Sequence, residues 1–309
     1  MNIFISGSLA YDRIMDFPGR FVDHILPEKI HVLNVCFNIN GLVEKFGGTA
    51  GNIAYSLAVL GESPFIVATW GRDFSPYEKW LLKNSLPTAC IKAITSVLTA
   101  CAYITTDRDD NQITAFNPGA MAFEADLPVL DGSSMVFIGP GNKMDMMNFS
   151  QKARLAGAPF FFDPGQSLNI WNDDELREAV RGALCFISND YELSLFLRMT
   201  GWAMKDLYKA VGVVITTKGS DGVVIDPGGD KLLIPAVPVR KVVDPTGAGD
   251  AFRAGVLKAK MMDLPWDIAC QVGAAVASFS VEHYGTQEHS FTWEQFCERY
   301  SANYGALVC

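Results

Sequence analysis

The 309-residue sequence predicts an α/β fold in which helices cover both faces of a mostly parallel sheet. Short runs rich in β-branched and aromatic residues recur along the chain, and helical patterns lie between them. Two segments, 13–46 and 100–116, break this alternation. We find no repeat, low-complexity run or linker, and the length lies near the upper limit for one hydrophobic core. We therefore expect a single domain over residues 1–309 with a small appendage.

Each predicted strand is a continuous apolar run, which is typical of a strand buried on both faces. The strands are expected at 3–6, 65–69, 135–138, 159–162, 185–188 and 213–217. Helices are expected at 52–60, 144–156, 173–181, 191–199 and 204–210, and the pattern is again helical from 250 through 262 and from 266 to 282.

The two irregular segments predict a second, smaller sheet. The first contains the strand-like run 32–39, and the second carries 102–106 and 113–116 around a polar turn. A loop of such length without its own structure is unusual inside a compact domain, so we expect a β-sheet lid built from parts of 13–46 and 100–116. The first segment has more apolar residues than one solvated strand needs, which favours a homodimer contact through the lid over a monomer: Val32, Leu33, Val35, Phe37 and Ile39.

Composition excludes several classes of protein. The net charge of −9 argues against nucleic acid as the main ligand, because such binders need a basic surface. No stretch approaches the roughly 18 apolar residues that cross a bilayer. The seven cysteines are scattered without a Cys-x-x-Cys pair, so neither a disulfide framework nor a zinc site is indicated. We expect a cytoplasmic protein with reduced thiols that binds no membrane.

The motif most indicative of chemistry is Asp-Pro-Thr-Gly-Ala-Gly-Asp-Ala-Phe at 244–252, between a β-branched approach and a predicted helix. Small residues let the backbone come close to a ligand, and their amides with the helix N-terminus form an anion site suited to a transferred phosphoryl group. Asp250 is placed to accept a proton from an attacking hydroxyl. In the alternative interpretation, Asp250 is only a helix N-cap and the glycines only make a turn.

Segment 244–255 resembles the C-terminal signature of the ribokinase-like carbohydrate kinases. Segment 47–52, Gly-Gly-Thr-Ala-Gly-Asn, resembles their N-terminal signature about 200 residues earlier, and the similarity extends from residue 3 to about 304. The resemblance implies a ribokinase-like three-layer α/β/α domain with a β-sheet lid, ATP as phosphate donor and Mg²⁺ as cofactor. It implies Asp250 as catalytic base and an anion hole at Gly247, Ala248 and Gly249.

Within the family, segments 7–12, 17–21, 117–121 and 188–192 together resemble bacterial adenosine kinases. This resemblance implies phosphorylation of the 5′-hydroxyl of adenosine to AMP, as in purine salvage. The alternatives are an inosine-guanosine kinase, a ribokinase or another sugar kinase. From a different class, a nucleoside-binding sensor that keeps the fold without turnover is also considered.

Candidate ribose contacts follow the first strand, where ligands of open α/β sheets bind. The Asp12 carboxylate can accept hydrogen bonds from the 2′ and 3′ hydroxyls, and Ser8 lies beside it in sequence. Gly48 permits close approach of the sugar, and Asn52 can donate and accept toward a hydroxyl. In the alternative interpretation, Asp12 caps a turn and Gly48 belongs to a flexible helix entry.

For the purine base, the resemblance implies stacking on Tyr103 and Phe116 of the lid, with Met121 and Gln166 nearby. Sequence alone favours an ordinary core role for the two aromatic residues and a polar loop role for Gln166.

For the nucleotide, the resemblance assigns Asn189 and Glu192 to Mg²⁺, through water, and to the ATP phosphates. A capping box at the start of a helix is a compatible second interpretation of this pair. The remaining ATP contacts are implied at Thr217, Lys218, Gly219, Ser220, Asp221, Gly222 and Gly249. The family also tends to place K⁺ beside the anion hole, with Asp244, Thr246 and segment 278–285 as candidate ligands.

Overall fold

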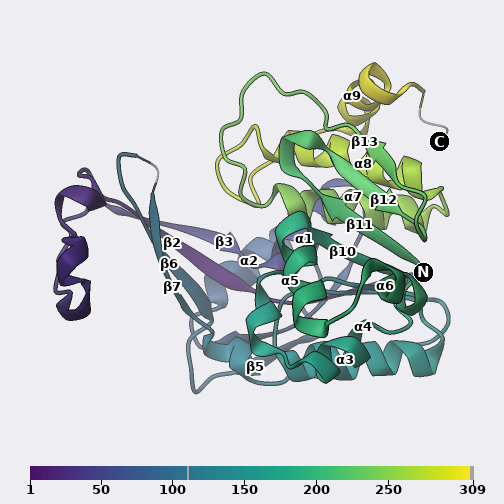
Figure 1. Ribbon diagram of the computed structural model, residues 1–309, viewed down its shortest axis with the longest axis horizontal. Coiled ribbons are helices and arrows are strands. Elements are labelled where there is room, and N and C mark those ends of the chain that lie inside the picture. Colours follow the sequence, from purple (N-terminus) through teal and green to yellow (C-terminus); the bar gives the residue numbers. More distant parts are fainter. Residues whose placement is uncertain (110, 307–309) are drawn as a thin grey trace.

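The computed structural model describes residues 1–109 and 111–306. A nine-stranded sheet forms the centre of the molecule, with helices on both faces, and a four-stranded sheet projects from it (Figure 1). The strand order in the large sheet is β13-β12-β11-β10-β9-β8-β1-β4-β5. Strands β4, β5 and β8 to β11 run parallel to β1, whereas β11–β12 and β12–β13 pair antiparallel. The expected three-layer α/β/α fold with a small second sheet is confirmed.

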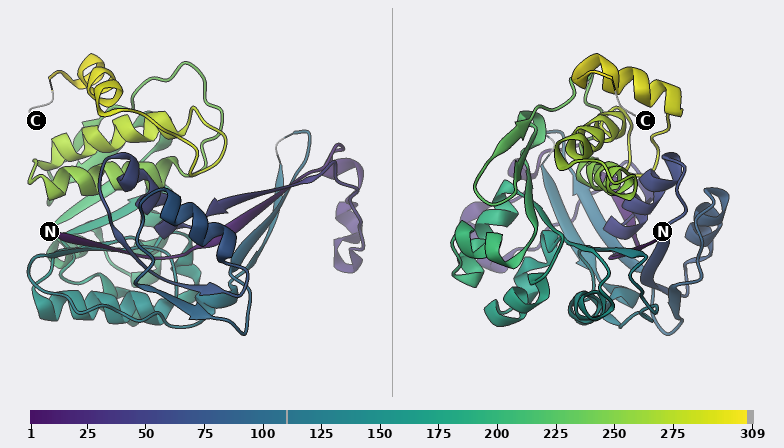
Figure 2. Two further views of the ribbon diagram at one scale, coloured as in Figure 1. Left: turned by 180° about the vertical axis from the view of Figure 1, so that it is seen from behind. Right: turned by 90° about the vertical axis from the view of Figure 1, so that its right-hand side faces the viewer.

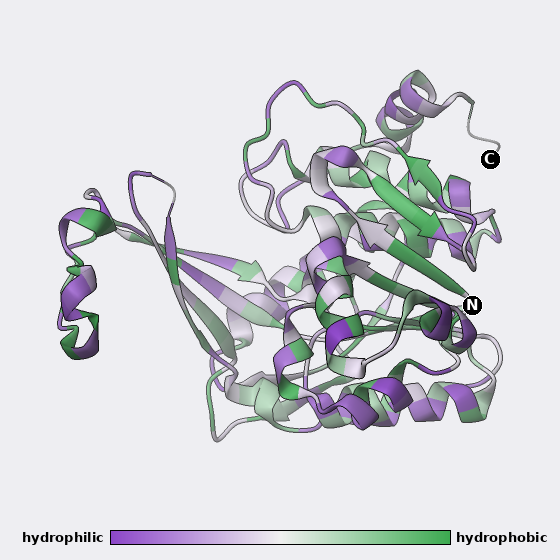
Figure 3. Cartoon of the chain, viewed as in Figure 1, coloured by the Kyte–Doolittle hydropathy of each residue, from purple (hydrophilic) through white to green (hydrophobic). Residues whose placement is uncertain are grey.

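All six strands predicted for the large sheet are present, and the sequence missed three other strands of that sheet, β5, β12 and β13. The strands of the large sheet are β1 (Asn2–Ser6), β4 (Phe65–Gly71), β5 (Ile91–Ile94), β8 (Ser134–Ile138), β9 (Phe160–Phe162), β10 (Cys185–Asn189), β11 (Val213–Thr217), β12 (Val223–Asp226) and β13 (Leu232–Ile234). Their colouring is mostly hydrophobic in Figure 3, as expected for strands covered on both faces.

Successive side chains of a strand point to opposite faces of the sheet and so belong to two separate hydrophobic cores. Ile3 and Ile5 of β1 pack on one face, whereas Phe4 packs on the other. The first face is covered by α1 (Thr49–Val59), α2 (Ser75–Lys83), α7 (Ala248–Met261), α8 (Trp266–Ser280) and α9 (Trp293–Tyr304). The second is covered by α3 (Lys143–Ala156), α4 (Asp173–Val180), α5 (Asp190–Thr200) and α6 (Met204–Ala210). The two layers of helices are seen on opposite sides of the sheet in Figure 2.

Strand β1 lies where the strand order reverses. From β1 the chain first builds β4 and β5 on one side and then β8 through β13 on the other. Ligands of open α/β sheets bind at the carboxyl ends of the strands beside such a reversal. The residues that follow β1, β8, β9, β10 and β11 therefore meet where a ligand site is expected.

The projecting lid is a four-stranded sheet in the order β3-β2-β6-β7 (Figure 1). Its strands are β2 (Ala10–Asp16), β3 (Leu42–Gly47), β6 (Ala100–Thr106) and β7 (Gln112–Asn117). Strand β2 pairs antiparallel with β3 and parallel with β6, and β6 pairs antiparallel with β7. The lid thus begins directly after β1, at the crevice.

One predicted strand is wrong. Segment 32–39 is not extended in the sheet, because residues Pro27–Val32 form a 3₁₀ helix and 33–39 are irregular. The reason is an aromatic cluster, in which Phe37 lies 4.7 Å from Phe17 and 5.1 Å from Phe21 between ring centroids. These contacts hold Phe37 against residues that lie outside the four strands of the small sheet.

Among the described residues, no helix combines the length and the apolar composition that a bilayer span requires.

Candidate active site

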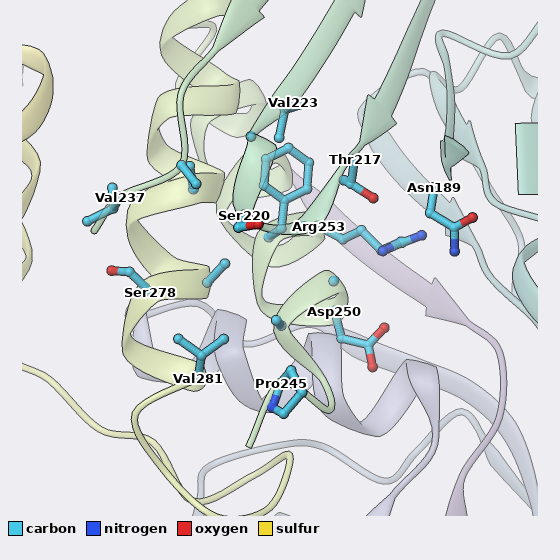
Figure 4. A pocket seen from close by; sticks show the side chains of 18 of the residues that line it. Asn189, Thr217, Ser220, Val223, Val237, Pro245, Asp250, Arg253, Ser278 and Val281 are labelled. Atoms are coloured by element: carbon cyan, nitrogen blue, oxygen red, sulfur yellow. The ribbon is translucent and has the colours of Figure 1, made fainter. Parts of the chain in front are cut away.

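A cavity of about 820 Å³ lies at the carboxyl edge of the large sheet, between β9, β10 and β11 on one side and α7 and α8 on the other (Figure 4). Its polar end is lined by Asp163, Asn189, Glu192, Asp250 and Arg253. Its apolar end is lined by Val223, Ala236, Val237, Ala274, Ala277 and Val281. A ligand with one charged end and one flat apolar end matches this division.

The turn before α7 forms one wall of the cavity. Gly247 has φ +78°, and a Cβ there would also meet the Thr286 side chain at 2.9 Å, so only glycine fits. Helix α7 begins at Ala248, and the first amides of a helix have no acceptor of their own within it. The turn therefore presents the N-terminus of a 14-residue helix to the cavity.

Asp250 is the third residue of α7, so the interpretation of Asp250 as N-cap is wrong, since Gly247 occupies that position. Burial raises the pKa of the Asp250 carboxyl to about 6, against the lowering effects of the Arg253 guanidinium and a hydrogen bond from Asn52. A carboxylate with this pKa is ionised at neutral pH and is a stronger base than an ordinary aspartate. Asp250 is therefore suited to general-base chemistry.

Both the nitrogen and the oxygen of the Asn52 side-chain amide are hydrogen-bonded. Its Nδ2 donates to Asp250 Oδ2 at 2.8 Å, and its Oδ1 accepts from Thr286 Oγ1 at 2.8 Å and from Gln287 Nε2 at 3.0 Å. Gln287 Nε2 also lies 2.6 Å from the Tyr77 hydroxyl. Sequence reasoning named Asn52 as a ribose contact, and the structure shows its amide hydrogen-bonded to Asp250.

Asp12 lies in β2, opposite Lys45 of β3 and Ala102 of β6, so the interpretation of Asp12 as a turn cap is wrong. Burial raises the pKa of its carboxyl to about 6, and the charges of Asp250 and Asp244 act in the same direction. The Asp12 carboxylate is therefore close enough to Asp250 for their charges to interact.

The Gly47–Gly48 segment permits a close backbone approach at the lid base. Gly48 has φ +88°, and a Cβ on it would lie 2.6 Å from the Ser8 carbonyl oxygen. The Ser8 hydroxyl oxygen accepts from the Thr49 amide at 3.0 Å and so supports the start of α1. Gly48 is the N-cap of α1, so the segment is a helix entry, as the alternative interpretation expected, and it also allows close approach of the backbone.

The two lid aromatics lie on opposite faces of the small sheet. Asp12 pairs with Ala102 and Ala102 with Phe116, which places Phe116 on the Asp12 face, where it is 49% exposed. Tyr103 pairs with Arg13 and projects from the other face, and its hydroxyl accepts from Arg13 Nη1 at 2.9 Å. Tyr103 is therefore not placed to stack on a base bound beside Asp12, which corrects that expectation.

The other two residues expected near a purine lie in 3₁₀ turns. Gln166 is exposed within Gly165–Ile170 and lines the cavity. Met121 is half-buried within Gly119–Ala122, where its carbonyl accepts from Asn142 Nδ2 at 3.2 Å. Only Gln166 of this pair reaches the cavity wall.

Asn189 and Glu192 form the capping box that starts α5, as one interpretation of the sequence expected. The Glu192 amide donates to Asn189 Oδ1 at 2.7 Å, and the Asn189 amide donates to Glu192 Oε2 at 2.9 Å. Burial, with the charge of Asp163, raises the pKa of the Glu192 carboxyl. Both side chains also line the cavity, so a capping role and a ligand role are compatible here.

Segment 217–222 is the turn between β11 and the antiparallel strand β12. Four of its residues line the cavity: Thr217, Gly219, Ser220 and Gly222. Lys218 and Asp221 are exposed and do not line the cavity, so their nucleotide contacts stay a prediction.

Asp244 is hydrogen-bonded to two loops beside the turn that precedes α7. Its Oδ1 accepts from the Thr246 amide at 2.9 Å and its Oδ2 from the Gly285 amide at 3.0 Å. The segments named from sequence for a cation thus lie side by side.

Sequence reasoning missed an ion pair and an apolar wall. Arg253 Nε lies 2.5 Å from Asp163 Oδ2, and both side chains are buried at the polar end of the cavity. The position of Asp163 directly after a predicted strand was a usable signal. The wall formed by 236–239 and α8 had none, because its apolar residues resemble ordinary core.

The chain was compared with known proteins. The sequence model of the pfkB family carbohydrate kinases matches residues 19–293. A nucleoside kinase of Methanocaldococcus jannaschii is 32% identical over 275 residues, which span 88% of this chain and 91% of the relative.

Solved structures agree in fold over nearly the whole chain. The nucleoside kinase of Burkholderia thailandensis in complex with inosine has a TM-score of 0.85 at 35% identity and covers 98% of both chains. The M. jannaschii nucleoside kinase, described as an archaeal member of the ribokinase family, has a TM-score of 0.87 at 29% identity, with 98% of this chain and 99% of that chain covered. The matched length, the two signatures and the shared fold together show that this chain belongs to the pfkB family of carbohydrate kinases.

Proposed function

We propose that this protein is an ATP-dependent nucleoside kinase that phosphorylates the 5′-hydroxyl of a purine nucleoside, with adenosine as the first candidate. The observation that carries the proposal is the position of Asp250, a carboxylate of raised pKa beside the N-terminus of α7. The nucleoside kinases of M. jannaschii and B. thailandensis support the substrate class. We expect the enzyme to act in the cytoplasm.

In the proposed reaction, Asp250 accepts the proton of the 5′-hydroxyl as its oxygen forms a bond to the γ-phosphorus. The bond from that phosphorus to the β,γ-bridging oxygen breaks, and ADP leaves. Asn52 holds the Asp250 carboxylate through its 2.8 Å hydrogen bond. Amides of Gly247, Ala248 and Gly249, with the α7 dipole, stabilise negative charge on the transferred group. The lid excludes water that would otherwise hydrolyse ATP.

The nucleoside lies against the face of the lid that carries both Asp12 and Phe116. The Asp12 carboxylate accepts from the 2′ and 3′ hydroxyls, and Phe116 offers an exposed ring for stacking on the base. Gln166 supplies amide groups for the purine edge. This arrangement orients the 5′-hydroxyl toward Asp250.

The nucleotide occupies the 820 Å³ cavity, with its base against the apolar wall and its phosphates toward α7. Residues at the polar end fit Mg²⁺, because the capping box uses Oε2 of Glu192 and leaves Oε1 for a water of the ion's shell. When bound, Mg²⁺ would neutralise charge on the phosphates. Asn189 and Glu192 would hold it through water.

A monovalent cation fits beside the anion-binding turn. Asp244 accepts from the Thr246 and Gly285 amides, so the two loops named as sources of ligands lie side by side there. Potassium bound in this place would order the turn without touching substrate. Replacement of potassium by a bulky organic cation at constant ionic strength should slow turnover, and an unchanged rate would remove this site.

Inosine is the second candidate substrate, because the relative from B. thailandensis binds it in its solved complex. Adenosine and inosine differ at the purine 6-position, as an amino group or an oxo group. An amide such as Gln166 can donate to one and accept from the other. The geometry of Gln166 therefore permits either substrate.

A substrate panel tests the proposal. Initial rates are measured with ATP and Mg²⁺ for adenosine, inosine, guanosine, cytidine, ribose and fructose, with ATP hydrolysis in the absence of acceptor as the blank. The proposal expects the highest kcat/KM for a purine nucleoside. A preference for a free sugar, or no transfer to any acceptor, would contradict it.

A further inference from the structure

The buried Arg253 has donor groups that the fold does not use. Its side chain is 9% exposed, and its Nε donates to Asp163 Oδ2 at 2.5 Å. Among the described residues, no hydrogen-bond acceptor is found for Nη1 or Nη2 of Arg253. Arg253 lines the cavity, so its Nη1 and Nη2 groups are available to an anionic ligand bound there.

The direction of the side chain places these donors near the start of α7. Helical side chains point toward the N-terminus of their helix, and residues three and four apart share a face. Arg253 is three residues after Asp250 and four after Gly249, and a Cβ on Gly249 would lie 2.7 Å from Arg253 Nη1. The guanidinium therefore lies over the first turn, where the anion site is.

Three carboxylates surround this one arginine. Asp163 pairs with it directly, and the charges of Asp250 and Glu192 also act on it. Figure 4 shows the side chain crossing from α7 toward Asn189, above Asp250. Asp163 contacts Arg253 only at Nε. Its Oδ1 accepts from the Gly165 amide at 3.0 Å, so the Asp163 carboxylate is held in place and orients the guanidinium. The terminal nitrogens stay directed into the cavity.

We propose that Arg253, braced by Asp163, contacts the γ-phosphoryl group of the donor nucleotide and stabilises its charge during transfer. This inference rests on the proposed function. A guanidinium presents a planar fork that matches two oxygens of a phosphoryl group, which an ammonium cannot reproduce. Because the arginine is already ordered and desolvated, little reorganisation is needed when the group transfers.

Binding measurements separate a γ-phosphate contact from a structural role. Dissociation constants are determined in Mg²⁺ for ADP and for β,γ-methylene-ATP, with the wild type and Arg253→Lys, which retains a charge opposite Asp163. We expect the affinity of Arg253→Lys for β,γ-methylene-ATP to fall about tenfold and that for ADP to change less than threefold. Its kcat should fall about 10²- to 10³-fold. Equal changes for the two nucleotides, or a kcat within threefold of the wild type, would overturn the assignment.

Two further variants keep the test decisive. Arg253→Gln combined with Asp163→Asn removes both charges, so a folding failure caused by an unpaired buried carboxylate is avoided, and the same loss of γ-phosphate discrimination is expected. Arg177→Lys on α4 is the matched control, since Arg177 also pairs with carboxylates but lies outside the cavity lining. If the wild type neither transfers phosphate nor binds ATP, the proposed function fails. If it does both while the Arg253 variants match it, only this inference fails.

Discussion

Asn52 at the start of α1 donates to Asp250 in the first turn of α7, with 2.8 Å between Nδ2 and Oδ2. The two family signatures, about 200 residues apart in the sequence, thus meet through one hydrogen bond. This bond lowers the pKa of the Asp250 carboxyl, against the larger raising effect of burial. If Asp250 is the base, as proposed, the N-terminal signature acts on the chemical step through this bond.

Removing this bond should shift the pH dependence of the enzyme. In Asn52→Ala, the pKa of Asp250 rises further, so a smaller fraction of the base is ionised near pH 6 to 7. We expect the acid limb of the kcat/KM profile to move to higher pH and kcat at pH 8 to fall about three- to tenfold. Asn303→Ala, at an exposed amide of α9, is the control. An unchanged acid limb in Asn52→Ala would show that Asn52 does not act on the base.

The Asp250 carboxyl should lower stability at neutral pH. The pKa of this carboxyl is about 6 in the folded protein and 3.8 in the unfolded chain. Between pH 3.8 and 6 the folded state therefore binds more protons, and the protein loses stability as the pH rises through this range. Asp250→Asn avoids this loss and should be more stable by about 1 to 2 kcal/mol at pH 8, after allowance for solvent screening in the open cavity.

Thermal unfolding at pH 4 and pH 8 measures the effect. The Tm of Asp250→Asn should exceed that of the wild type by about 2 to 6 °C at pH 8 and by clearly less at pH 4. Glu298→Gln, an exposed site on α9, serves as control. A Tm difference that is the same at both pH values would refute the assigned electrostatic cause.

Asp12 should recognise the ribose hydroxyls. Asp12→Ala is expected to weaken adenosine by about 2 kcal/mol, or about 30-fold in Kd, because charged acceptors of buried hydroxyls are lost. The loss for 2′,3′-dideoxyadenosine should be much smaller, since that ligand has no hydroxyl to present. Titration calorimetry of both ligands makes the comparison, and equal losses would dismiss the assigned role.

The lid is expected to form a homodimer contact. Phe37 packs inward, but other apolar side chains of the lid segment between β2 and β3 are exposed. They are Val22, Leu26, Ile30, Val32, Leu33, Val35 and Ile39. Such a patch on an extended sheet is commonly covered by a partner. Light scattering at micromolar concentration should give twice 33.8 kDa. A fully active species of 33.8 kDa at high concentration would show that the lid serves the substrate alone.

The order of strands and helices could be predicted because each element carries its own pattern. Apolar runs marked all six strands predicted for the large sheet. The missed strands β5, β12 and β13 are only three or four residues long, and Lys92 interrupts the apolar pattern of β5. The 32–39 segment was misjudged because the cluster around Phe37 depends on Phe17 and Phe21, which lie elsewhere in the chain. Local alternation contains no information on such a contact.

The candidate site could be predicted in part for a similar reason. Motif positions named Asp250 and Asp12, but the face on which Tyr103 projects depends on strand register, which sequence did not supply. Arg253 lies within the signature segment 244–255 and still gave no signal, because its importance arises from Asp163, 90 residues away. Contacts between distant segments thus account for most of what was missed.

The most direct test of the central claim compares turnover and binding in Asp250→Asn. The substitution keeps the size of the side chain and removes the base, so kcat for the preferred purine nucleoside should fall about 10²- to 10⁴-fold while nucleoside and ADP dissociation constants change less than about threefold. Single-turnover phosphate transfer, with calorimetry on the same preparation, gives both quantities. Transfer by Asp250→Asn at near the wild-type rate would contradict the assignment of Asp250 as the base.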